Sequence, residues 1–309
     1  MSEHSTISWT GATWPIVAGC EYVSPGCSNC WAVRDSWRLA HNPHREVRQA
    51  FAGTVRKQPD GKLVWTGHVR TLPERLWWPM HWKKPRKIFV CSQSDLFHRA
   101  VPFEFIAAVF GVMAMAKQHT FQVLTKHPDR AREFFDWIQN DADGPTWGCI
   151  LHARDYGPMT ESLRAEPSDD GAPWPLPNVW FGVTTEDQRR ADERLEHLRH
   201  IPAAKHWVSA EPLLEHIDLS PWLDFLDWVV GGGESAQTRK ETRDCDLAWL
   251  LSLRAQCAAA GVPYLNKQLG SRPIWNEIRL EPPRGKTSRY KWHEPERWPV
   301  DLRKQEFPG

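Results

Sequence analysis

Short apolar runs alternate along most of the chain with longer stretches in which apolar residues recur every three or four positions. The short runs predict buried strands, and the longer stretches predict amphipathic helices. The predicted strands are 12–18, 87–91, 120–124, 178–183, 206–209, 226–231 and 262–266, and the clearest predicted helices are 103–117, 186–200 and 245–260. Strand and helix alternating this often predict the α/β class, with parallel strands forming a complete or partial (β/α) barrel.

Local signals predict where two of these helices begin or end. Thr185 and Gln188 have the spacing of a capping box at the start of 186–200. Gly261 directly follows 245–260 and is a suitable C-terminal stop.

Three segments interrupt the alternation. Residues 43–75 are predicted to be an excursion with a turn at 59–61. Residues 139–176 are rich in Asp, Gly and Pro and too long for a simple connection, so we expect a flap or subdomain there. The segment 271–309 is predicted to wrap the barrel as an irregular tail. We therefore expect a single barrel domain over residues 1–309 with two insertions.

Composition and charge narrow the class of protein. Of the 309 residues, 41% are apolar and 25% are charged, so the chain can bury a core without a disulfide or metal staple. The 39 Lys and Arg balance the 38 Asp and Glu, which argues against a protein that binds mainly by neutralising many phosphates. No apolar run approaches the roughly 20 residues of a membrane span, and no signal core is present near the first residues. We expect a cytoplasmic protein with no membrane partner.

Polar residues follow every predicted strand. In parallel barrels the loops beyond the carboxyl ends of the strands converge, so these residues are candidates for one shared pocket. Polar residues also follow strands as caps and turns, which explains any single cluster equally well. The candidate residues are Cys20, Cys27, Cys30, Ser92, Ser94, Asp95, Lys126, Glu211, Gly232, Gly233, Glu234 and Lys267.

The most specific motif is Cys20-x6-Cys27-x2-Cys30, which brings three of the seven cysteines together on one loop. Thiolates select zinc or iron–sulfur clusters, and structural zinc and electron-transfer clusters take four protein ligands. Three local cysteines leave one iron of a [4Fe–4S] cluster open, as in enzymes that bind S-adenosylmethionine on the cluster and cleave it reductively. The alternative is a structural zinc site completed by His98 or His127.

Sequence similarity favours the first interpretation. The stretch ISWTGATWPIVAGCEYVSPGCSNCWA resembles the opening of the largely phage-encoded three-Cys-motif protein family. The similarity continues at 83–98, 119–130, 177–194, 209–214, 227–235, 266–270 and 298–308. The resemblance implies a barrel similar to those of radical S-adenosylmethionine enzymes, located in the host-cell cytoplasm if phage-encoded. The commonest motif of those enzymes has three residues in its first gap and an aromatic residue before the third cysteine, whereas this chain has six residues in that gap and Asn29 before Cys30.

Four candidates are expected to bind the cofactor through side chains. Ser92, Ser94 and Asp95 follow a core strand and can accept hydrogen bonds from the methionyl ammonium group or the ribose of S-adenosylmethionine. Lys126 follows the next strand and can pair with the methionyl carboxylate. The structural alternatives are a helix cap and a solvated lysine at the start of a helix.

The other candidates are two glycines and three charged side chains. Gly232 and Gly233 would let the backbone approach the cofactor closely. Glu211, Glu234 and Lys267 are expected to hold the substrate over the barrel mouth, with Glu211 aimed by the Pro that follows it. The structural alternative for Lys267 is a salt bridge to Glu211 or Glu234.

Together these features predict a radical S-adenosylmethionine enzyme with a [4Fe–4S] cluster. An external electron donor would reduce the cluster, and cleavage of the cofactor would yield methionine and a 5′-deoxyadenosyl radical that takes hydrogen from the substrate. Phages of this type often modify their DNA, so a nucleobase in a nucleotide or in DNA is the first substrate expected. Trp77, Trp78 and Trp82, beside Lys83 and Lys84, form a patch typical of base stacking, although core packing explains them equally well. The alternative function is a non-catalytic zinc or iron–sulfur nucleic-acid-binding protein.

Overall fold

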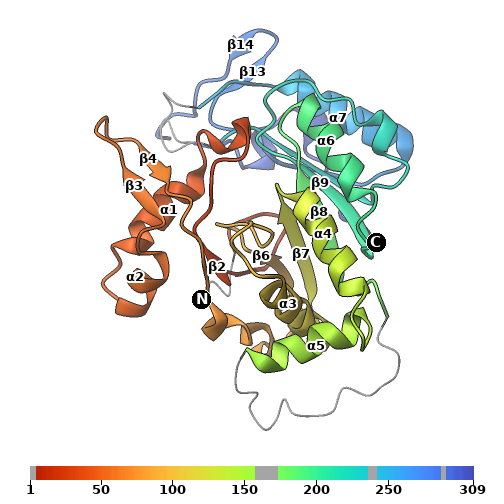
Figure 1. Cartoon of the computed structure of the whole chain (residues 1–309). Helices are drawn as coiled ribbons and strands as arrows, with labels where there is room; N and C mark the ends of the chain where they lie inside the picture. Colours follow the sequence, from red (N-terminus) through yellow and green to blue (C-terminus); the bar gives the residue numbers. More distant parts are fainter. Residues whose placement is uncertain (1–4, 157–172, 236–241, 287–289) are drawn as a thin grey trace. The chain divides into compact units, whose positions relative to one another are not determined.

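The computed structural model describes residues 5–156, 173–235, 242–286 and 290–309, and Figure 1 shows its ribbon. Its contacts divide the chain into two compact units. The first unit comprises Met1–Glu21, Ser36–Phe181 and His200–Ala204, and the second comprises Tyr22–Asp35, Gly182–Arg199 and Lys205–Gly309. The chain therefore passes between the units several times.

The main sheet has seven strands in the order β1-β6-β7-β8-β9-β10-β12. These strands are β1 (Ala12–Trp14), β6 (Lys87–Val90), β7 (Thr120–Thr125), β8 (Val179–Thr184), β9 (Lys205–Ala210), β10 (Trp228–Gly232) and β12 (Tyr264–Gln268). β6 pairs in parallel with β1 and β7, and β10 pairs in parallel with β9 and β12. The predicted α/β class is confirmed. The sheet is that of a partial (β/α) barrel, because β1 and β12 are its two edge strands and do not pair with each other to close it.

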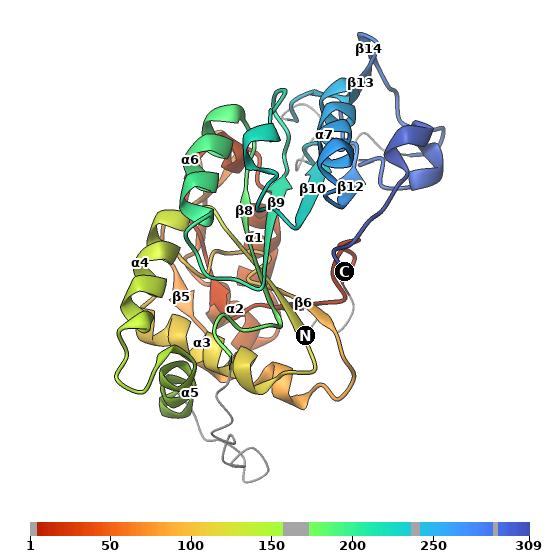
Figure 2. The same cartoon turned by 90° about the vertical axis from the view of Figure 1, so that its right-hand side faces the viewer.

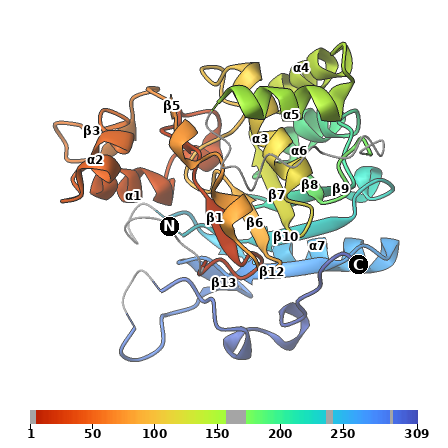
Figure 3. The ribbon, with the colours of Figure 1, turned by 90° about the horizontal axis from the view of Figure 1, so that it is seen from below.

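The first unit carries three helices: α3 (Phe103–Met115), α4 (Pro128–Gln139) and α5 (Pro145–Asp155). Ten consecutive residues of α3 are buried, and Figure 3 shows α5 beside this helix. A Cβ atom at Gly111 would lie 2.1 Å from the carbonyl oxygen of Cys149, so glycine is required for the close approach of α3 and α5. The flap predicted at 139–176 therefore begins as a helix, and its residues 157–172 lie outside the described residues.

The excursion predicted at 43–75 is a small helix-and-hairpin structure. Its elements are α2 (Arg45–Phe51), β3 (Val55–Lys57), β4 (Leu63–Trp65) and β5 (Arg70–Thr71). β3 and β4 form an antiparallel hairpin whose turn includes Gly61 at φ 87°, as the predicted turn requires. Ala50 and Phe51 of α2 pack with Ala18 and Leu72 in a minor core.

One predicted strand is wrong. Residues 12–18 form two short strands, β1 and β2 (Val17–Ala18), which belong to different sheets. β2 pairs antiparallel with β5, outside the main sheet. Pro15 lies between the two strands and has no N–H to continue the first ladder.

The second unit carries α6 (Gln188–Leu198) and α7 (Leu247–Ala260). The capping box predicted for α6 is wrong, because Asp187 is the N-cap and its side chain accepts a 2.8 Å hydrogen bond from the backbone N–H of Arg190. α7 begins two residues later than predicted, after Asp246, and ends as predicted at Gly261, whose φ is 71°.

The remaining elements are short. They are α1 (Trp31–Ala40), β11 (Cys245–Asp246), β13 (Pro273–Trp275), β14 (Ile278–Arg279), η1 (Pro25–Cys27), η2 (Pro73–Arg75), η3 (Trp78–His81), η5 (Ser220–Trp222), η6 (Pro295–Arg297) and η7 (Val300–Leu302). The predicted irregular tail is confirmed over 271–286 and 290–309, where the structure describes β13, β14 and two 3-10 helices. No helix in the described ranges has the length and apolar character needed to span a membrane.

The two faces of the sheet in the second unit have different roles. Figure 2 shows β9, β10 and β12 next to one another, with α7 against them. A Cβ atom at Gly231 would meet Leu250 of α7, so Trp228 and Gly232, which alternate with Gly231 along β10, face away from this helix. On that opposite face Trp228 packs between Trp207 and Phe307, with ring centroids 5.3 and 5.4 Å apart. Aromatic rings therefore fill one end of this face, and the polar candidates follow the strands at the other end.

Candidate functional site

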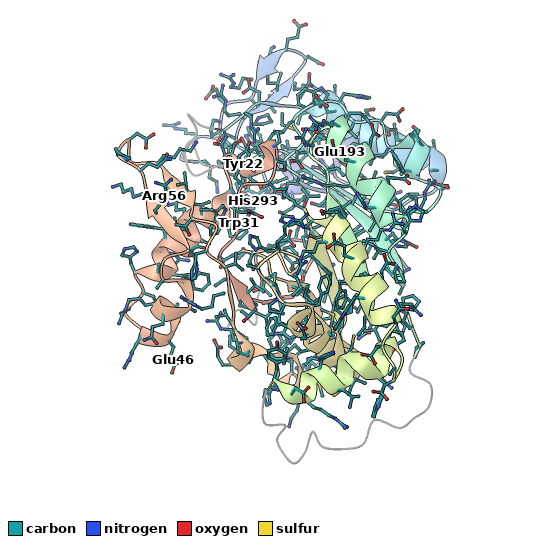
Figure 4. The ribbon with its side chains drawn as sticks, viewed as in Figure 1. Tyr22, Trp31, Glu46, Arg56, Glu193 and His293 are labelled. Carbon is teal, nitrogen blue, oxygen red and sulfur yellow. The ribbon has the colours of Figure 1, made fainter. Side chains whose placement is uncertain are left out.

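Cys27 and Cys30 lie on a tight turn that leads into α1 in the second unit. The backbone N–H of Cys27 donates to the Ser24 carbonyl at 2.8 Å, and the N–H of Cys30 donates to the Cys27 carbonyl at 3.3 Å. Both thiols are partly exposed. The aromatic residues that flank this turn, Tyr22 and Trp31, are 62% and 38% exposed and are labelled in Figure 4.

A buried ion pair supports this turn at Gly26. The Glu186 side chain is fully buried, and its Oε2 lies 2.7 Å from Nη1 of Arg194. Its other oxygen, Oε1, accepts from the Gly26 N–H at 3.3 Å. A Cβ atom at Gly26 would lie 3.1 Å from the Glu186 carboxyl carbon, which makes glycine the best residue for this close contact.

Glu234 is a second support of the same turn. The residue is 5% exposed, and its Oε2 accepts from Asn29 Nδ2 at 3.0 Å and from the Arg243 backbone N–H at 2.8 Å. The Arg243 guanidinium also pairs with Glu234 and donates to the Pro25 carbonyl at 2.9 Å. The Glu234 carboxylate is thus held by groups around the cysteine turn, and Asn29, where the common motif has an aromatic residue, takes part in holding it.

Glu211 and Lys267 form a separate polar group in this unit. Lys267 Nζ and Gln268 Nε2 each lie 2.6 Å from one oxygen of the Glu211 carboxylate, so the salt bridge foreseen as a structural alternative is present. Lys291 is exposed when its whole surface is considered, but its ammonium group is partly desolvated. This desolvation lowers the pKa of Lys291, and the charge of Lys267 lowers it further. The group therefore presents a carboxylate, an amide and two ammonium groups within one unit.

Gly232 and Gly233, predicted to face the cofactor, have structural partners here. The Gly232 carbonyl accepts from the Leu213 N–H at 2.9 Å. A Cβ atom at Gly233 would lie 2.3 Å from the Leu269 carbonyl oxygen, so its glycine is explained by close packing within the chain.

In the first unit Asp95 ties two loops together. Its Oδ1 accepts from the Thr125 hydroxyl at 2.7 Å, and its Oδ2 accepts from the Lys126 backbone N–H at 2.8 Å. The Ser94 hydroxyl donates to the Val17 carbonyl at 2.8 Å. Asp95 and Ser94 thereby position the backbone of neighbouring loops. The side chains of Ser92 and Lys126 are half-buried.

Two histidines approach Glu21, the residue after Cys20. His98 Nε2 and His127 Nε2 lie 3.2 and 3.9 Å from Glu21 Oε1, and both histidines are buried. His98 Nδ1 accepts from the Ala100 N–H at 3.1 Å, so a neutral His98 carries its proton on Nε2. Burial lowers the pKa of His98, and the charge of Glu21 acts in the opposite direction.

The seven cysteines fall into two groups. Cys20, Cys27 and Cys30 are partly exposed thiols, whereas Cys91, Cys149, Cys245 and Cys257 are buried. Burial raises the pKa of Cys91, Cys245 and Cys257 to about 12, and it also raises the pKa of Cys149. The three cysteines of the motif are therefore the accessible soft ligands of the chain.

Cys20 lies in the first unit, and Cys27 and Cys30 lie in the second. Over the described ranges, no three His, Cys, Asp or Glu side chains are spaced as a metal-binding group. The three cysteines are suitable ligands for an iron–sulfur cluster because of their chemistry, since they are accessible thiols on one short loop.

Of the predicted aromatic patch, Trp82 is buried in the first unit, and Trp77 and Trp78 are half-buried. Trp82 is 6% exposed, and the Arg86 guanidinium lies 5.3 Å from its ring centroid. The Arg75 guanidinium similarly covers Trp78 at 5.2 Å. These cation–π contacts favour core packing over base stacking for both rings.

One protein-family model matches most of the chain. The model of the family described as protein of unknown function DUF5131 matches residues 4–298. The chain belongs to the DUF5131 family. No curated protein and no solved structure matches it. The family has no known function, so the function of this chain is inferred from its residues.

The sequence did not single out Arg194 or Arg243, although both support the cysteine turn. It marked Glu186 only as part of the polar cluster 184–186 that follows a predicted strand, and in the structure Glu186 lies two residues after the end of β8. Arg194 is buried within a predicted amphipathic helix, and Arg243 belongs to no predicted strand or helix, so neither position is marked by local pattern. The predicted convergence of Asp95 and Lys126 with Glu211, Glu234 and Lys267 stays a prediction, because the first two residues belong to the first unit and the other three to the second.

Proposed function

We propose that the protein is a radical S-adenosylmethionine enzyme whose [4Fe–4S] cluster is held by Cys20, Cys27 and Cys30. The observation that carries the proposal is the accessibility of these three thiols in a chain whose other four cysteines are buried. Thiolates are the ligands that iron–sulfur clusters take, and three of them leave one iron open for a further ligand.

When bound, the cluster would supply one electron, received from an external donor, to break the S–C5′ bond of S-adenosylmethionine into methionine and a 5′-deoxyadenosyl radical. The protein's part is to bind and orient the cofactor. Lys126, whose backbone N–H is held by Asp95, would pair with the methionyl carboxylate. Ser92 would accept a hydrogen bond from the methionyl ammonium group or the ribose.

The substrate side is assigned to Glu211 and Lys267. Together with Gln268 they offer hydrogen-bond donors and acceptors in one group, which is what recognition of the edge of a nucleobase requires. A nucleobase, in a nucleotide or in DNA, is accordingly the substrate class proposed. Glu234 is assigned a positioning role, since Asn29 and Arg243 already use its carboxylate.

The test is anaerobic reconstitution of the full chain with iron and sulfide, followed by metal analysis and a visible absorption spectrum. Cys20→Ala, Cys27→Ala and Cys30→Ala should each lose the cluster. Cys257→Ala is the matched control, because this thiol is fully buried in α7 and its loss should leave the iron content unchanged.

A second measurement tests the cofactor. The reconstituted wild type should bind S-adenosylmethionine and release 5′-deoxyadenosine on reduction. Lys126→Ala should weaken cofactor binding by about tenfold to hundredfold, the usual loss for a hydrogen bond to a charged group, with the iron content unchanged. Cluster-loaded protein that neither binds the cofactor nor cleaves it under strong reductant would refute the radical-enzyme function.

The second candidate function is a zinc or iron–sulfur nucleic-acid-binding protein without catalysis. It is supported by His98 and His127, which approach Glu21 in the unit that contains Cys20. Purified protein that contains zinc alone, lost on replacement of either histidine or the motif cysteines, would establish this function in place of the first.

A further inference from the structure

The segment from the second half of α1 to the end of β5 concentrates positive charge. Residues 36–71 contain seven Lys or Arg and two acidic residues, whereas the whole chain has 39 and 38. This segment therefore carries a net charge of +5, and the rest of the chain a net charge of −4. Concentration of one sign on a nearly neutral protein marks a surface for a partner of the opposite charge.

Five of these cations form what we call the basic surface: Arg45, Arg48, Arg56, Lys57 and Lys62. All five are exposed, and none forms an ion pair within the parts of the chain that the structure describes. Of the two acidic residues, Asp60 uses Oδ1 to accept from the backbone N–H of Lys62, not from its ammonium group. The basic surface is thus not neutralised by its own segment.

Regular structure presents these cations in fixed positions. Arg45 and Arg48 project from the side of α2 opposite Val47, Ala50 and Phe51, which pack in the minor core. This follows from helical spacing, since residues three apart lie on one face. The apolar side of α2 is therefore already used within the protein.

The hairpin carries the other three cations. Arg56 pairs with Val64 and Lys57 with Leu63 across the ladder, and Lys62 directly precedes β4. The Thr66 hydroxyl bonds to the Gly53 carbonyl at 2.7 Å and braces the base of the hairpin. Figure 4 labels Arg56 on the hairpin and Glu46 on α2, the two elements that make up the basic surface.

We propose that the basic surface binds the phosphate backbone of a nucleic acid without reading its sequence. Five exposed cations without ion-pair partners can contact phosphates, with Arg56 and Lys57 on opposite faces of β3, and binding would release the counterions condensed on the nucleic acid. A membrane surface is disfavoured because none of the large exposed apolar side chains lies within 36–71, and insertion at a lipid interface needs such side chains. The proposal does not depend on a metal or on the proposed reaction.

The experiment measures binding of the full chain to a labelled DNA duplex of random sequence and to a single strand of equal length, over a range of salt concentrations. With about five phosphate contacts, the apparent affinity should fall by roughly 10²-fold to 10³-fold between about 50 and 200 mM salt. Scrambling the sequence should leave the affinity unchanged. The cluster-free Cys27→Ala protein should bind as the wild type does, which separates this proposal from the proposed enzyme function.

The test variant is Arg45→Gln/Arg56→Gln/Lys57→Gln. Its salt dependence should become shallower by about 3 on the logarithmic slope, one for each cation removed. The matched control changes three exposed cations of the same unit outside the segment, Arg99→Gln/Lys117→Gln/Arg132→Gln, and so alters the net charge equally. This control should retain the slope of the wild type, and circular dichroism should show that both variants are folded.

Three results would overturn the proposal. The first is absence of wild-type binding to either nucleic acid at about 50 mM salt, where phosphate contacts are strongest. The second is equal weakening in the test variant and the matched control, which would assign binding to net charge alone. The third is tighter binding to vesicles of acidic lipid or to polyglutamate than to DNA, which would identify a membrane or an acidic protein as the partner.

Discussion

Removing the cation from the buried Glu186–Arg194 pair should strongly destabilise the second unit. Glu186 is fully buried, and its Oε2 lies 2.7 Å from Arg194 Nη1, which also donates to the Thr184 carbonyl at 2.6 Å. In Arg194→Met the Glu186 carboxylate would remain buried without its counter-charge. We expect the free energy of unfolding to fall by about 3–5 kcal/mol, the usual cost of breaking one partner of a buried pair.

The magnitude comes from desolvation of the charge that remains, so neutralising that charge should restore stability. Glu186→Gln keeps an oxygen that can accept from the Gly26 N–H but removes the carboxylate charge. The double variant Glu186→Gln/Arg194→Met should therefore recover most of the loss. A coupling free energy of about 2 kcal/mol or more between the two positions is expected.

The assay is urea unfolding followed by circular dichroism, with stability taken from the midpoint and the slope. Arg189→Met is the control on the same helix, because Arg189 pairs with Glu193 in an exposed ion pair whose loss should leave the midpoint unchanged. An Arg194→Met midpoint equal to that of the wild type would refute the reasoning. So would a double variant as unstable as the sum of its two single variants.

Two further predictions concern the cysteine turn and the pH dependence of stability. Arg243→Met should remove the guanidinium that pairs with Glu234 and donates to the Pro25 carbonyl, so Cys27 of the cluster-free protein should react with iodoacetamide about tenfold faster, measured by mass spectrometry. An unchanged rate would show that the turn does not need this contact, and Arg243→Lys should restore part of the protection. Burial lowers the pKa of His119, whose Nδ1 has no hydrogen-bond partner among the residues that the structure describes. Its contribution to stability is complete above the unfolded pKa of about 6.5 and is lost as the pH falls toward the lower folded value. His119→Gln should therefore flatten the fall in the urea midpoint between about pH 7.5 and pH 5, and an unaltered pH profile would contradict this assignment.

Local pattern was sufficient for three neighbouring strands of the main sheet. The runs predicted at 87–91, 120–124 and 178–183 match β6, β7 and β8 within one residue at each end. Strands buried on both faces need apolar residues at every position, and this requirement is visible in a single sequence. The alternation with helices then determined the α/β class.

Competition between neighbouring signals explains the local errors. Thr185 and Asp187 both have side chains that can cap a helix, and the structure uses Asp187. The run 12–18 is apolar except for Thr13, but Pro15 divides it between two sheets. α5 lies in a segment rich in Asp, Gly and Pro, and it packs against α3 through a glycine that only the structure explains.

The sequence by itself determined the three-cysteine motif, the fold class and the polar residues beyond each strand. Only the tertiary structure decided with which partners those polar residues pair. Glu234 is held by Arg243 and Asn29, and Lys267 is paired with Glu211. The physical reason is that any of the 39 Lys and Arg of the chain can pair with a given carboxylate, and the choice depends on distances that the fold creates between residues far apart in sequence.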